Sequence, residues 1–371
     1  MDGWLILEWL IKSVVLVLIL LGGFAYLTLF ERRVLAFMQV RIGPNRAGWQ
    51  GILQPIADAV KLIFKEELTP GQVIQPLFAL APIITVVPAV VIAAVVPWGP
   101  DVEMFGRVIK LSVADIGLGT LYIAAVASVA VYGIVLAGWS SNNKYAMMGG
   151  IRSSAQVISY ELSLALCFVL VTVLAGSMQA REIVEAQREV WFFFIQPVGG
   201  LIFLVATLAE VNRAPFDMPE AEQELTAGYH SEYAGMKFAL FFMAEYIKMI
   251  AIAAIAAMLF FGGYREFPLF ANTWLSVDVN WWLGPLYMFA KVVVLLFFMI
   301  WIRATLPRMR YDRLMSFGWK VMLPLSLSLV FVTALGILSN LIWLIPVLSI
   351  AIGLLFIFFI DRSLTTKLKR R

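Results

Sequence analysis

Nine long apolar runs constrain the fold of this chain more than any other feature of its sequence. A helix needs about 20 mostly apolar residues to cross the roughly 30 Å hydrocarbon core of a bilayer. The expected spans are 10–30, 76–96, 117–139, 157–177, 191–209, 238–261, 281–302, 321–338 and 341–360. None of them alternates apolar and polar residues as the strands of a membrane β-barrel do. The sequence therefore predicts an all-α, polytopic membrane helix bundle that forms a single membrane domain over residues 1–371.

Composition excludes a soluble enzyme. Hydrophobic residues make up 62% of the 371 residues and charged residues only 14%, against about 25% charge in soluble domains. The chain also has a single cysteine, Cys167, and a single histidine, His230. These cannot supply the ligands of an iron-sulfur cluster, a bis-histidine haem or a zinc site. We therefore expect no metal on this chain, and any redox chemistry to take place on a partner.

The lysines and arginines predict the orientation. Cytoplasmic loops of membrane proteins carry an excess of Lys and Arg. With the N-terminus outside, the cytoplasmic segments hold 20 of the 28 basic residues and the outer loops hold 5. An odd number of spans then places the basic C-terminal tail inside. We expect about nine transmembrane helices, with the N-terminus outside and the C-terminus cytoplasmic.

Three glutamates lie within or at the ends of predicted spans. Glu161 is four residues into the fourth span, Glu210 ends the fifth, and Glu245 is seven residues into the sixth. At about 1.5 Å per residue, all three fall within roughly 10 Å of the cytoplasmic boundary. Ionisable residues inside a bilayer are costly and are functional candidates. We expect the three to converge on one chamber that relays protons.

Two lysines also fall inside spans. Glu245 and Lys248 are spaced i, i+3 on one helix face, so a structural salt bridge between them competes with the relay interpretation. Lys291 stands near the middle of the seventh span without a partner in its own helix. We expect it to take part in the relay and to need a carboxylate or water from elsewhere in the bundle.

The cytoplasmic loop 210–237 is acidic where the other loops are basic. Clustered and desolvated carboxylates raise one another's pKa, which suits proton exchange near neutral pH. The alternative is a solvated acidic face that docks a basic partner. The acidic residues of this loop are Glu210, Asp217, Glu220, Glu222, Glu224 and Glu232, set against Arg213 and Lys237.

The cytoplasmic segment 31–75 contains an amphipathic pattern. Ile56, Val60, Ile63 and Phe64 recur at helical spacing, and Asp58 belongs to the opposite face. This pattern predicts a helix lying in the membrane interface. Plain membrane anchoring explains its aliphatic residues, but Asp58 does not fit lipid anchoring.

These residues together resemble one known family. The chain is similar to the H subunit of bacterial proton-pumping NADH-quinone oxidoreductase, respiratory complex I, over nearly its whole length and in the right order. The matching motifs are Glu31-Arg32-Arg33, the run from Gln39 to Arg46, the run from Gln54 to Asp58, Ile158-Ser159-Tyr160-Glu161, the run from Pro215 to Leu225, and Trp301-Ile302-Arg303-Ala304-Thr305.

The resemblance implies a membrane-arm protein without its own cofactors. In that family this protein joins the membrane arm to the hydrophilic arm, forms the entrance and tunnel for quinone, and couples quinone reduction to proton translocation through an acidic chamber. FMN and iron-sulfur clusters lie on partner subunits, quinone is the substrate, and the location is the bacterial inner membrane, with lipid but no nucleic acid as a partner. The positions that the resemblance and the sequence place at the tunnel are Glu31, Arg32, Arg41, Arg46, Asp58, Arg213, Phe216 and Arg303. Ser128 stands where some relatives have a further acid.

Three other functions remain open on the sequence alone. The membrane anchor of an energy-converting hydrogenase shares the spans and acids but handles no quinone. A ferredoxin-linked relative would take its electrons from a donor other than NADH, and the donor site would lie on other subunits. A secondary transporter could use the same acids, although no inverted repeat or matched pair of broken helices is visible.

Overall fold

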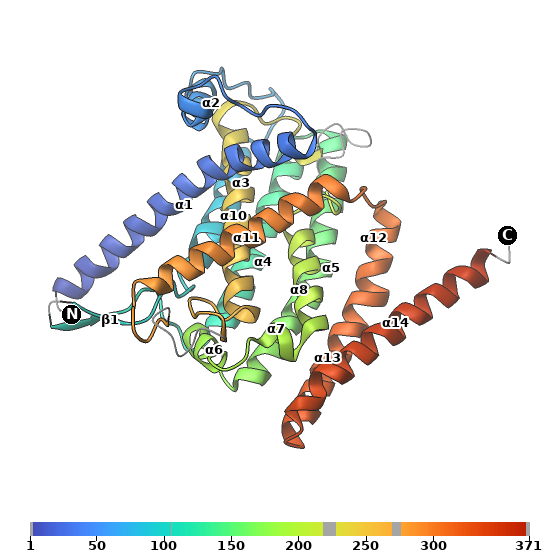
Figure 1. The fold of residues 1–371 in the computed structure, drawn as a ribbon. Helices are drawn as coiled ribbons and strands as arrows, with labels where there is room; N and C mark the ends of the chain where they lie inside the picture. The colour runs from blue at the N-terminus through green and yellow to red at the C-terminus, as the bar shows by residue number, and fades with distance from the viewer. Residues whose placement is uncertain (1–2, 105, 218–227, 269–275, 369–371) are drawn as a thin grey trace.

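The computed structural model describes residues 3–104, 106–217, 228–268 and 276–368, and these are mostly helical. The long helices form a bundle from which α1 and α14 extend on opposite sides (Figure 1). The one sheet in the described part is a hairpin of β1 (Val102–Met104) and β2 (Arg107–Ile109). The helices are α1 (Gly3–Met38), α2 (Gln54–Ile63), α3 (Gln75–Ala93), α4 (Gly119–Ser140), α5 (Lys144–Ala175), α6 (Ala180–Ala186), α7 (Phe192–Ile195), α8 (Pro197–Glu210), α10 (Gly235–Phe260), α11 (Leu283–Thr305), α12 (Tyr311–Phe317), α13 (Leu323–Leu338) and α14 (Ile345–Leu368), with short 3-10 turns η1 (Trp49–Gly51), η2 (Gly228–His230) and η5 (Ile342–Leu344) and the π-helical turn η4 (Gly318–Met322).

A polytopic membrane helix bundle is confirmed. Among the residues that the structure describes, seven helices are long and apolar enough to cross a membrane, and they match seven of the nine expected spans. The other two expected spans correspond to the shorter apolar helices Pro197–Glu210 and Ile342–Phe358. The total of nine crossings and their orientation remain predictions.

The fifth expected span is broken in the structure. Residues 191–209 form the single turn α7 and then α8, with Gln196 between them in a non-helical conformation. Pro197 begins α8, because proline fits the first turn of a helix but cannot donate to the preceding turn. Gln196 donates a 2.6 Å hydrogen bond to Thr333 in α13, which ties the break to the bundle.

Helix α5 shows how local sequence sets helix ends. The Asn143 side chain accepts a hydrogen bond of 2.9 Å from the backbone N–H of Tyr145 at the first turn. Gly176 ends the helix in the left-handed conformation, with φ of 69°, where glycine has no steric penalty. The helix begins 13 residues before the span that the sequence predicts, so it extends well beyond the apolar run.

Small residues allow the closest helix contacts. A Cβ at Gly133 of α4 would overlap Thr85 Cγ2 of α3 and would lie 2.9 Å from the Ala81 carbonyl oxygen of the same helix. Helices in membranes pack through such small residues because apolar burial gives no advantage over lipid. The pair α3 and α4 is therefore a rigid wall of the bundle.

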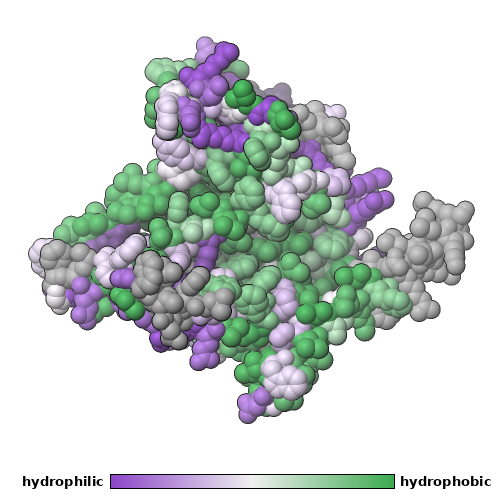
Figure 2. All heavy atoms as spheres, viewed as in Figure 1, coloured by the Kyte–Doolittle hydropathy of each residue, from purple (hydrophilic) through white to green (hydrophobic). Residues whose placement is uncertain are grey.

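Polar residues gather at the end of the molecule that holds α2. Figure 2 shows hydrophilic side chains over this end and a hydrophobic surface across the middle of the bundle. The outward parts of α1 and α14 expose many large apolar side chains, including Leu18 and Leu354 at 62% each. Such a surface suits lipid or a partner protein and not water.

The α3–α4 contact leads to a prediction on stability. Gly133→Val should lower the thermal unfolding midpoint of the detergent-solubilised protein, because overpacking costs about 1–3 kcal/mol. Gly22→Val in α1 is the matched control, since an added Cβ there meets no atom within 4 Å. Equal unfolding midpoints for the two variants would contradict the close α3–α4 packing.

Candidate functional site

An apolar slot of about 340 Å³ lies between α1, α2 and α10. Phe24 of α1, Leu62 of α2 and Phe242 and Met243 of α10 are among the residues that line it. Its size and lining are those of a site for a mostly apolar ligand, in which a few polar groups fix orientation. The charged residues of the lining are Arg32, Asp58 and Lys61.

The ion pair of Arg32 and Asp58 joins α2 to α1 beside this slot. Arg32 Nη1 lies 2.7 Å from Asp58 Oδ2, and Gln54 donates a 3.1 Å hydrogen bond to the other carboxylate oxygen. Partial burial alone would raise the pKa of Asp58, but these bonds and the charges of Arg32 and Lys61 hold the pKa below its ordinary value. The Asp58 charge is therefore kept at neutral pH, and it fixes the position of α2.

The apolar face that the sequence predicts on α2 is exposed. Ile56, Val60 and Ile63 are 56%, 46% and 59% exposed. This exposed apolar face is expected of a helix that lies in a membrane interface, and Ile63 also lines the slot. The helix itself is confirmed over Gln54–Ile63.

A buried carboxylate, Glu31, is the centre of a charged cluster. Helix α1 continues to Met38, so Glu31 lies within the helix and is only 3% exposed. It accepts hydrogen bonds from Tyr246 OH at 2.7 Å, from Arg213 Nη1 at 3.1 Å and from Arg303. A buried charge with a missing partner is strongly destabilising, so these contacts fix α1, α10, α11 and the segment after α8 relative to one another.

Arg213 connects Glu31 with a second buried acid, Glu245. Its Nε forms an ion pair with Glu245 Oε1, and its guanidinium lies 4.4 Å from the centre of the Tyr246 ring. Burial alone would lower the pKa of Arg213, but the carboxylates of Glu245 and Glu31 hold it above its ordinary range. Arg213 therefore stays charged and bridges the two acids.

A small cavity of about 50 Å³ lies beyond this cluster. Glu210, Glu245 and Lys248 line it together with His230. Lys248 Nζ lies 2.7 Å from Glu210 Oε1 and also donates to the Glu210 carbonyl oxygen at 2.9 Å. Burial lowers the pKa of His230 to about 3, which keeps this imidazole neutral. The cavity has room for about three water molecules, so protons could move between its polar groups.

Glu161 lies near this cavity but does not line it. It accepts a hydrogen bond from Ser128 of α4, and it is within electrostatic reach of Glu210. The Ser128 hydroxyl of α4 therefore contacts the neighbouring acid in α5 directly.

The start of the acidic loop is held on two sides. Asp217, 3% exposed, forms a 3.0 Å ion pair with Arg308 after α11. Phe216 packs on Tyr160 of α5, with ring centres 5.7 Å apart, and its carbonyl oxygen accepts a 2.7 Å hydrogen bond from Gln156. The first part of the acidic loop is thus fixed to α5 through Phe216 and to the segment after α11 through Asp217.

Lys291 is coordinated by backbone oxygens. Its Nζ donates to the carbonyl oxygens of Phe261 at 2.6 Å, Gly263 at 2.8 Å and Arg265 at 2.5 Å. The ammonium also lies 4.5 Å from the centre of the Trp191 ring. A helix leaves its last carbonyl groups without partners, and Lys291 binds carbonyls at and just beyond the end of α10. It therefore joins α11 to α10.

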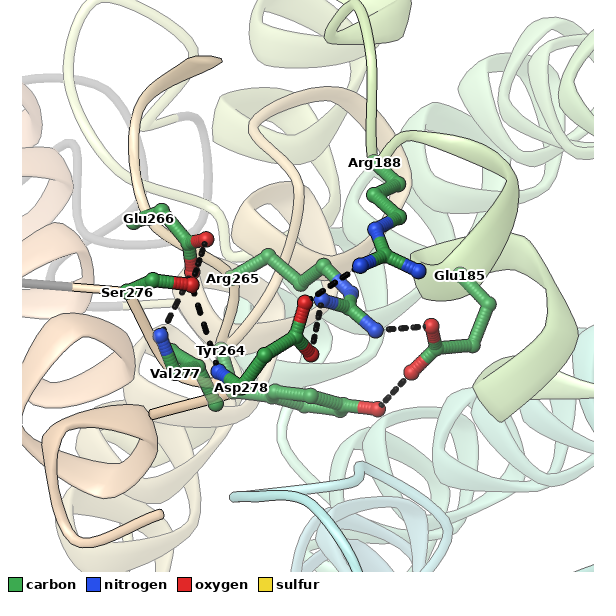
Figure 3. Close-up of polar contacts among 8 residues, drawn as sticks. All are labelled: Glu185, Arg188, Tyr264, Arg265, Glu266, Ser276, Val277 and Asp278. Atoms are coloured by element: carbon green, nitrogen blue, oxygen red, sulfur yellow. Dashed lines mark hydrogen bonds and ion pairs between the residues drawn. The ribbon is translucent and has the colours of Figure 1, made fainter. Parts of the chain in front are cut away.

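The residues after α10 also carry a charged cluster, at the end of the molecule opposite α2. Arg265 forms ion pairs with Glu185 of α6 and, at 3.1 Å, with Asp278 (Figure 3). Asp278 also forms a 2.5 Å ion pair with Arg188. Tyr264 donates a 2.5 Å hydrogen bond to Glu185. Burial alone would lower the pKa of Arg265, but its two carboxylate partners hold it above its ordinary value.

Glu266 ties the same segment to the chain before α11. Its carboxylate accepts a 2.9 Å hydrogen bond from Ser276 Oγ and a 3.1 Å hydrogen bond from the Val277 backbone N–H (Figure 3). The carbonyl oxygen of Arg265 meets Lys291 while its side chain meets Glu185 and Asp278. The segment 264–266 therefore contacts α6, α11 and the residues that precede α11.

Comparison with known proteins decides the family. The family model for NADH dehydrogenase matches residues 11–334. The chain belongs to this family. An H subunit of NADH-quinone oxidoreductase from Geobacter sulfurreducens is 48% identical over 336 residues, 87% of this chain and 93% of that protein. The H subunit of NADH-quinone oxidoreductase from Protochlamydia amoebophila is 46% identical over 313 residues, 84% of this chain and 91% of that protein. The resemblance predicted from the sequence motifs is thereby confirmed.

Within this family fold, the predicted tunnel residues separate into three groups. Arg32 and Asp58 line the slot. Glu31, Arg213 and Arg303 meet in the buried cluster. The remaining three line neither cavity: Phe216 packs on α5, Arg41 is exposed and bonded to Gln39, and Arg46 is exposed.

The structure gives other partners than an alternative pairing and an expectation from the sequence. Glu245 pairs with Arg213 and not with Lys248, which reaches Glu210 on another helix. Lys291 binds backbone carbonyls where the sequence predicts a carboxylate or water. Glu245 and Lys248 each pair with a residue distant in sequence, and Lys291 has these partners outside its own helix, as the sequence predicts. Glu220, Glu222 and Glu224 lie outside the described residues.

Three residues of the site carry little signal in the sequence. Tyr246 follows Glu245 in α10 without a motif of its own, yet its hydroxyl reaches Glu31. Arg308 stands in a basic loop and pairs with Asp217. His230 stands out only as the single histidine. These residues belong to the site because the fold brings them next to buried charged residues of other segments.

The buried cluster predicts a large penalty for losing its central acid. Glu31→Gln should lower the free energy of unfolding by about 3–5 kcal/mol, because Arg213 and Arg303 lose their shared carboxylate. Asp312→Asn removes the exposed pair with Arg310 and should cost less than about 1 kcal/mol. Denaturant unfolding monitored by tryptophan fluorescence measures both. Similar costs for the two variants would contradict a dehydrated cluster.

Lys291 predicts a second stability effect. Lys291→Met leaves three carbonyl oxygens without their donor, and each unsatisfied buried group costs about 1–3 kcal/mol. The thermal midpoint should therefore fall clearly, while Lys144→Met, at an exposed site, should leave it unchanged. An unaltered midpoint combined with lost proton translocation would instead favour the relay role.

Proposed function

We propose that this chain is a membrane-arm subunit of an NADH-quinone oxidoreductase, that the slot between α1, α2 and α10 admits quinone, and that the buried cluster couples quinone reduction to proton translocation. The relatives at 48% and 46% identity are named as H subunits of that enzyme. NADH oxidation, FMN and the iron-sulfur clusters belong to partner subunits of the hydrophilic arm. The complex lies in the bacterial inner membrane.

One observation carries the proposal: of two consecutive residues of α1, one lines the slot and the other belongs to the buried cluster. Arg32 lines the apolar slot, and Glu31 belongs to the buried cluster. Helix α10 repeats the arrangement one turn apart, since Phe242 lines the slot and Tyr246 bonds Glu31. The Phe242 and Tyr246 rings lie 4.8 Å apart. The slot and the cluster therefore share a wall one side chain thick.

The slot has the chemistry that a long-tailed quinone requires. An isoprenoid tail needs an apolar passage, and the head group needs a few polar contacts for orientation. Phe24, Phe242 and Met243 supply the apolar passage. Arg32 and Asp58 supply the polar contacts, and their ion pair holds α2 at the side of the slot.

Charge provides the coupling. Reduction of a quinone by two electrons consumes two protons, and the electrons come from an iron-sulfur cluster of a partner subunit. Negative charge that develops near the slot competes with Glu31 for Arg213 and Arg303 and draws protons toward the neighbouring acids. Because the cluster is buried, little solvent screens this effect. A changed Arg213 contact then reaches Glu245 directly and the cavity with Glu210 and Lys248.

The slot leads to a prediction on substrate binding. Met243→Trp should raise the apparent KM for a long-tailed quinone about tenfold, or about 1.4 kcal/mol, because the larger side chain fills the passage. Leu286→Trp on the exposed face of α11 is the control. NADH:quinone activity of membranes across a quinone series measures the effect. An unchanged KM in Met243→Trp places the quinone passage elsewhere.

The acids lead to a prediction on coupling. Glu161→Gln and Glu245→Gln should lower the number of protons translocated per NADH in proteoliposomes by half or more, while a substantial rate of quinone reduction remains. Asp312→Asn, at an exposed surface pair, should keep the wild-type ratio. Full proton translocation at full electron transfer in both glutamine variants overturns the proposed coupling.

A further inference from the structure

A second large cavity lies at the other end of the bundle. This groove of about 330 Å³ is formed by α1, the end of α3, the segment after β2 and the start of α11. Its walls are apolar, with Leu16 of α1, Val96 after α3 and Phe289 of α11 among them. Val15 and Phe289 are 47% and 63% exposed, so the groove opens on the surface that faces the bilayer. The slot described above is lined by other residues.

The groove is polar at one end and apolar along its length. Lys12, Val15, Leu16 and Ile19 lie at i, i+3, i+4 and i+7, so they share one face of α1. Lys12 is nearest the N-terminus of α1, and Lys110, the other charged residue of the lining, follows the β-hairpin. The apolar residues of α1 continue from Lys12 toward the middle of the helix. This gradient matches an amphiphile with its head at the helix end and its tail in the bilayer.

The polar end carries no net charge. Lys12 pairs with Glu8 at 2.5 Å, and Lys110 pairs with Asp115 at 2.6 Å. Two ammonium groups and two carboxylates therefore stand at this end. A polyanionic head group would meet both carboxylates, whereas a head group with one phosphate and one ammonium finds a partner for each charge.

We propose that this groove binds a zwitterionic phospholipid of the phosphatidylethanolamine class. Lys12 and Lys110 bind the phosphate. Glu8 and Asp115 accept hydrogen bonds from the ammonium of the lipid. An acyl chain lies along Val15, Leu16 and Ile19. Lysine suits this role because its stem follows apolar surface while the ammonium reaches the head-group layer. The bound lipid fills the space between α1 and the rest of the bundle. This site is independent of the quinone passage and of the acids that couple it.

Native mass spectrometry of the assembled complex tests the proposal. The complex is stripped of lipid with detergent and titrated with an equimolar mixture of phosphatidylethanolamine and phosphatidylglycerol. Four proteins are compared: wild type, the double variant Lys12→Met and Lys110→Met, Val15→Trp, and Lys320→Met as an exposed-lysine control. Val15→Trp fills the tail position and leaves both lysines in place.

We expect wild type and the control to bind one phosphatidylethanolamine that both groove variants lose, with a tenfold or greater rise in Kd. Equal binding by the groove variants, or a preference of wild type for phosphatidylglycerol, overturns the proposal. Should the variants fail to assemble, phosphatidylethanolamine with a photoreactive acyl chain is added to wild-type membranes. Labelling of peptides that contain residues 12–19 or 285–289 supports the site. Labelling of partner proteins or of other peptides of this chain, with no label in these two segments, overturns it.

Discussion

The structure depends on the buried ion pair between Glu31 and Arg213. A guanidinium inside a membrane bundle needs carboxylate partners and hydrogen bonds to offset its lost hydration. Here those partners come from two long helices, with Glu31 on α1 and Glu245 on α10. Arg303 adds α11 to the same cluster. Because each charge satisfies the others, the position of one helix determines the position of the next, and the slot and the buried cluster keep a common wall.

Both ends of the bundle hold ion pairs, and the end opposite α2 adds a lysine bound to backbone carbonyls. At the end near α2, side-chain acids and bases pair with one another, so any change of charge alters the contacts between helices. At the other end, Lys291 binds backbone carbonyls, which cannot change charge. On the proposed function, we infer that the Lys291 contacts stay fixed while the end near α2 responds to chemistry in the slot. Helix α11 connects the two, because it carries both Lys291 and Arg303.

The sequence predicted what depends on local pattern. The long apolar runs predicted the helices, and the spacing of Ile56, Val60 and Ile63 predicted α2. Pairing depends on contacts between distant segments, so it could not be predicted from local spacing. Glu245 and Lys248 are adjacent on one helix face, yet each finds a partner on another segment. The sequence predicted one unbroken span over 191–209 because the mean hydropathy of this run is high. Pro197, at the start of α8, was the local signal of the break.

Redox-induced infrared difference spectroscopy of the membrane-reconstituted complex gives the sharpest test of coupling through the buried cluster. Carboxylic acid groups that change protonation or hydrogen bonding give a resolved carbonyl band. Reduction of bound quinone should change a band that Glu245→Gln removes, because the slot and Glu245 are joined through Glu31 and Arg213. In assembled Glu31→Gln complex, this quinone-dependent change should disappear although Glu245 is intact. A Glu245 band that responds to quinone equally well without the Glu31 carboxylate would contradict this coupling.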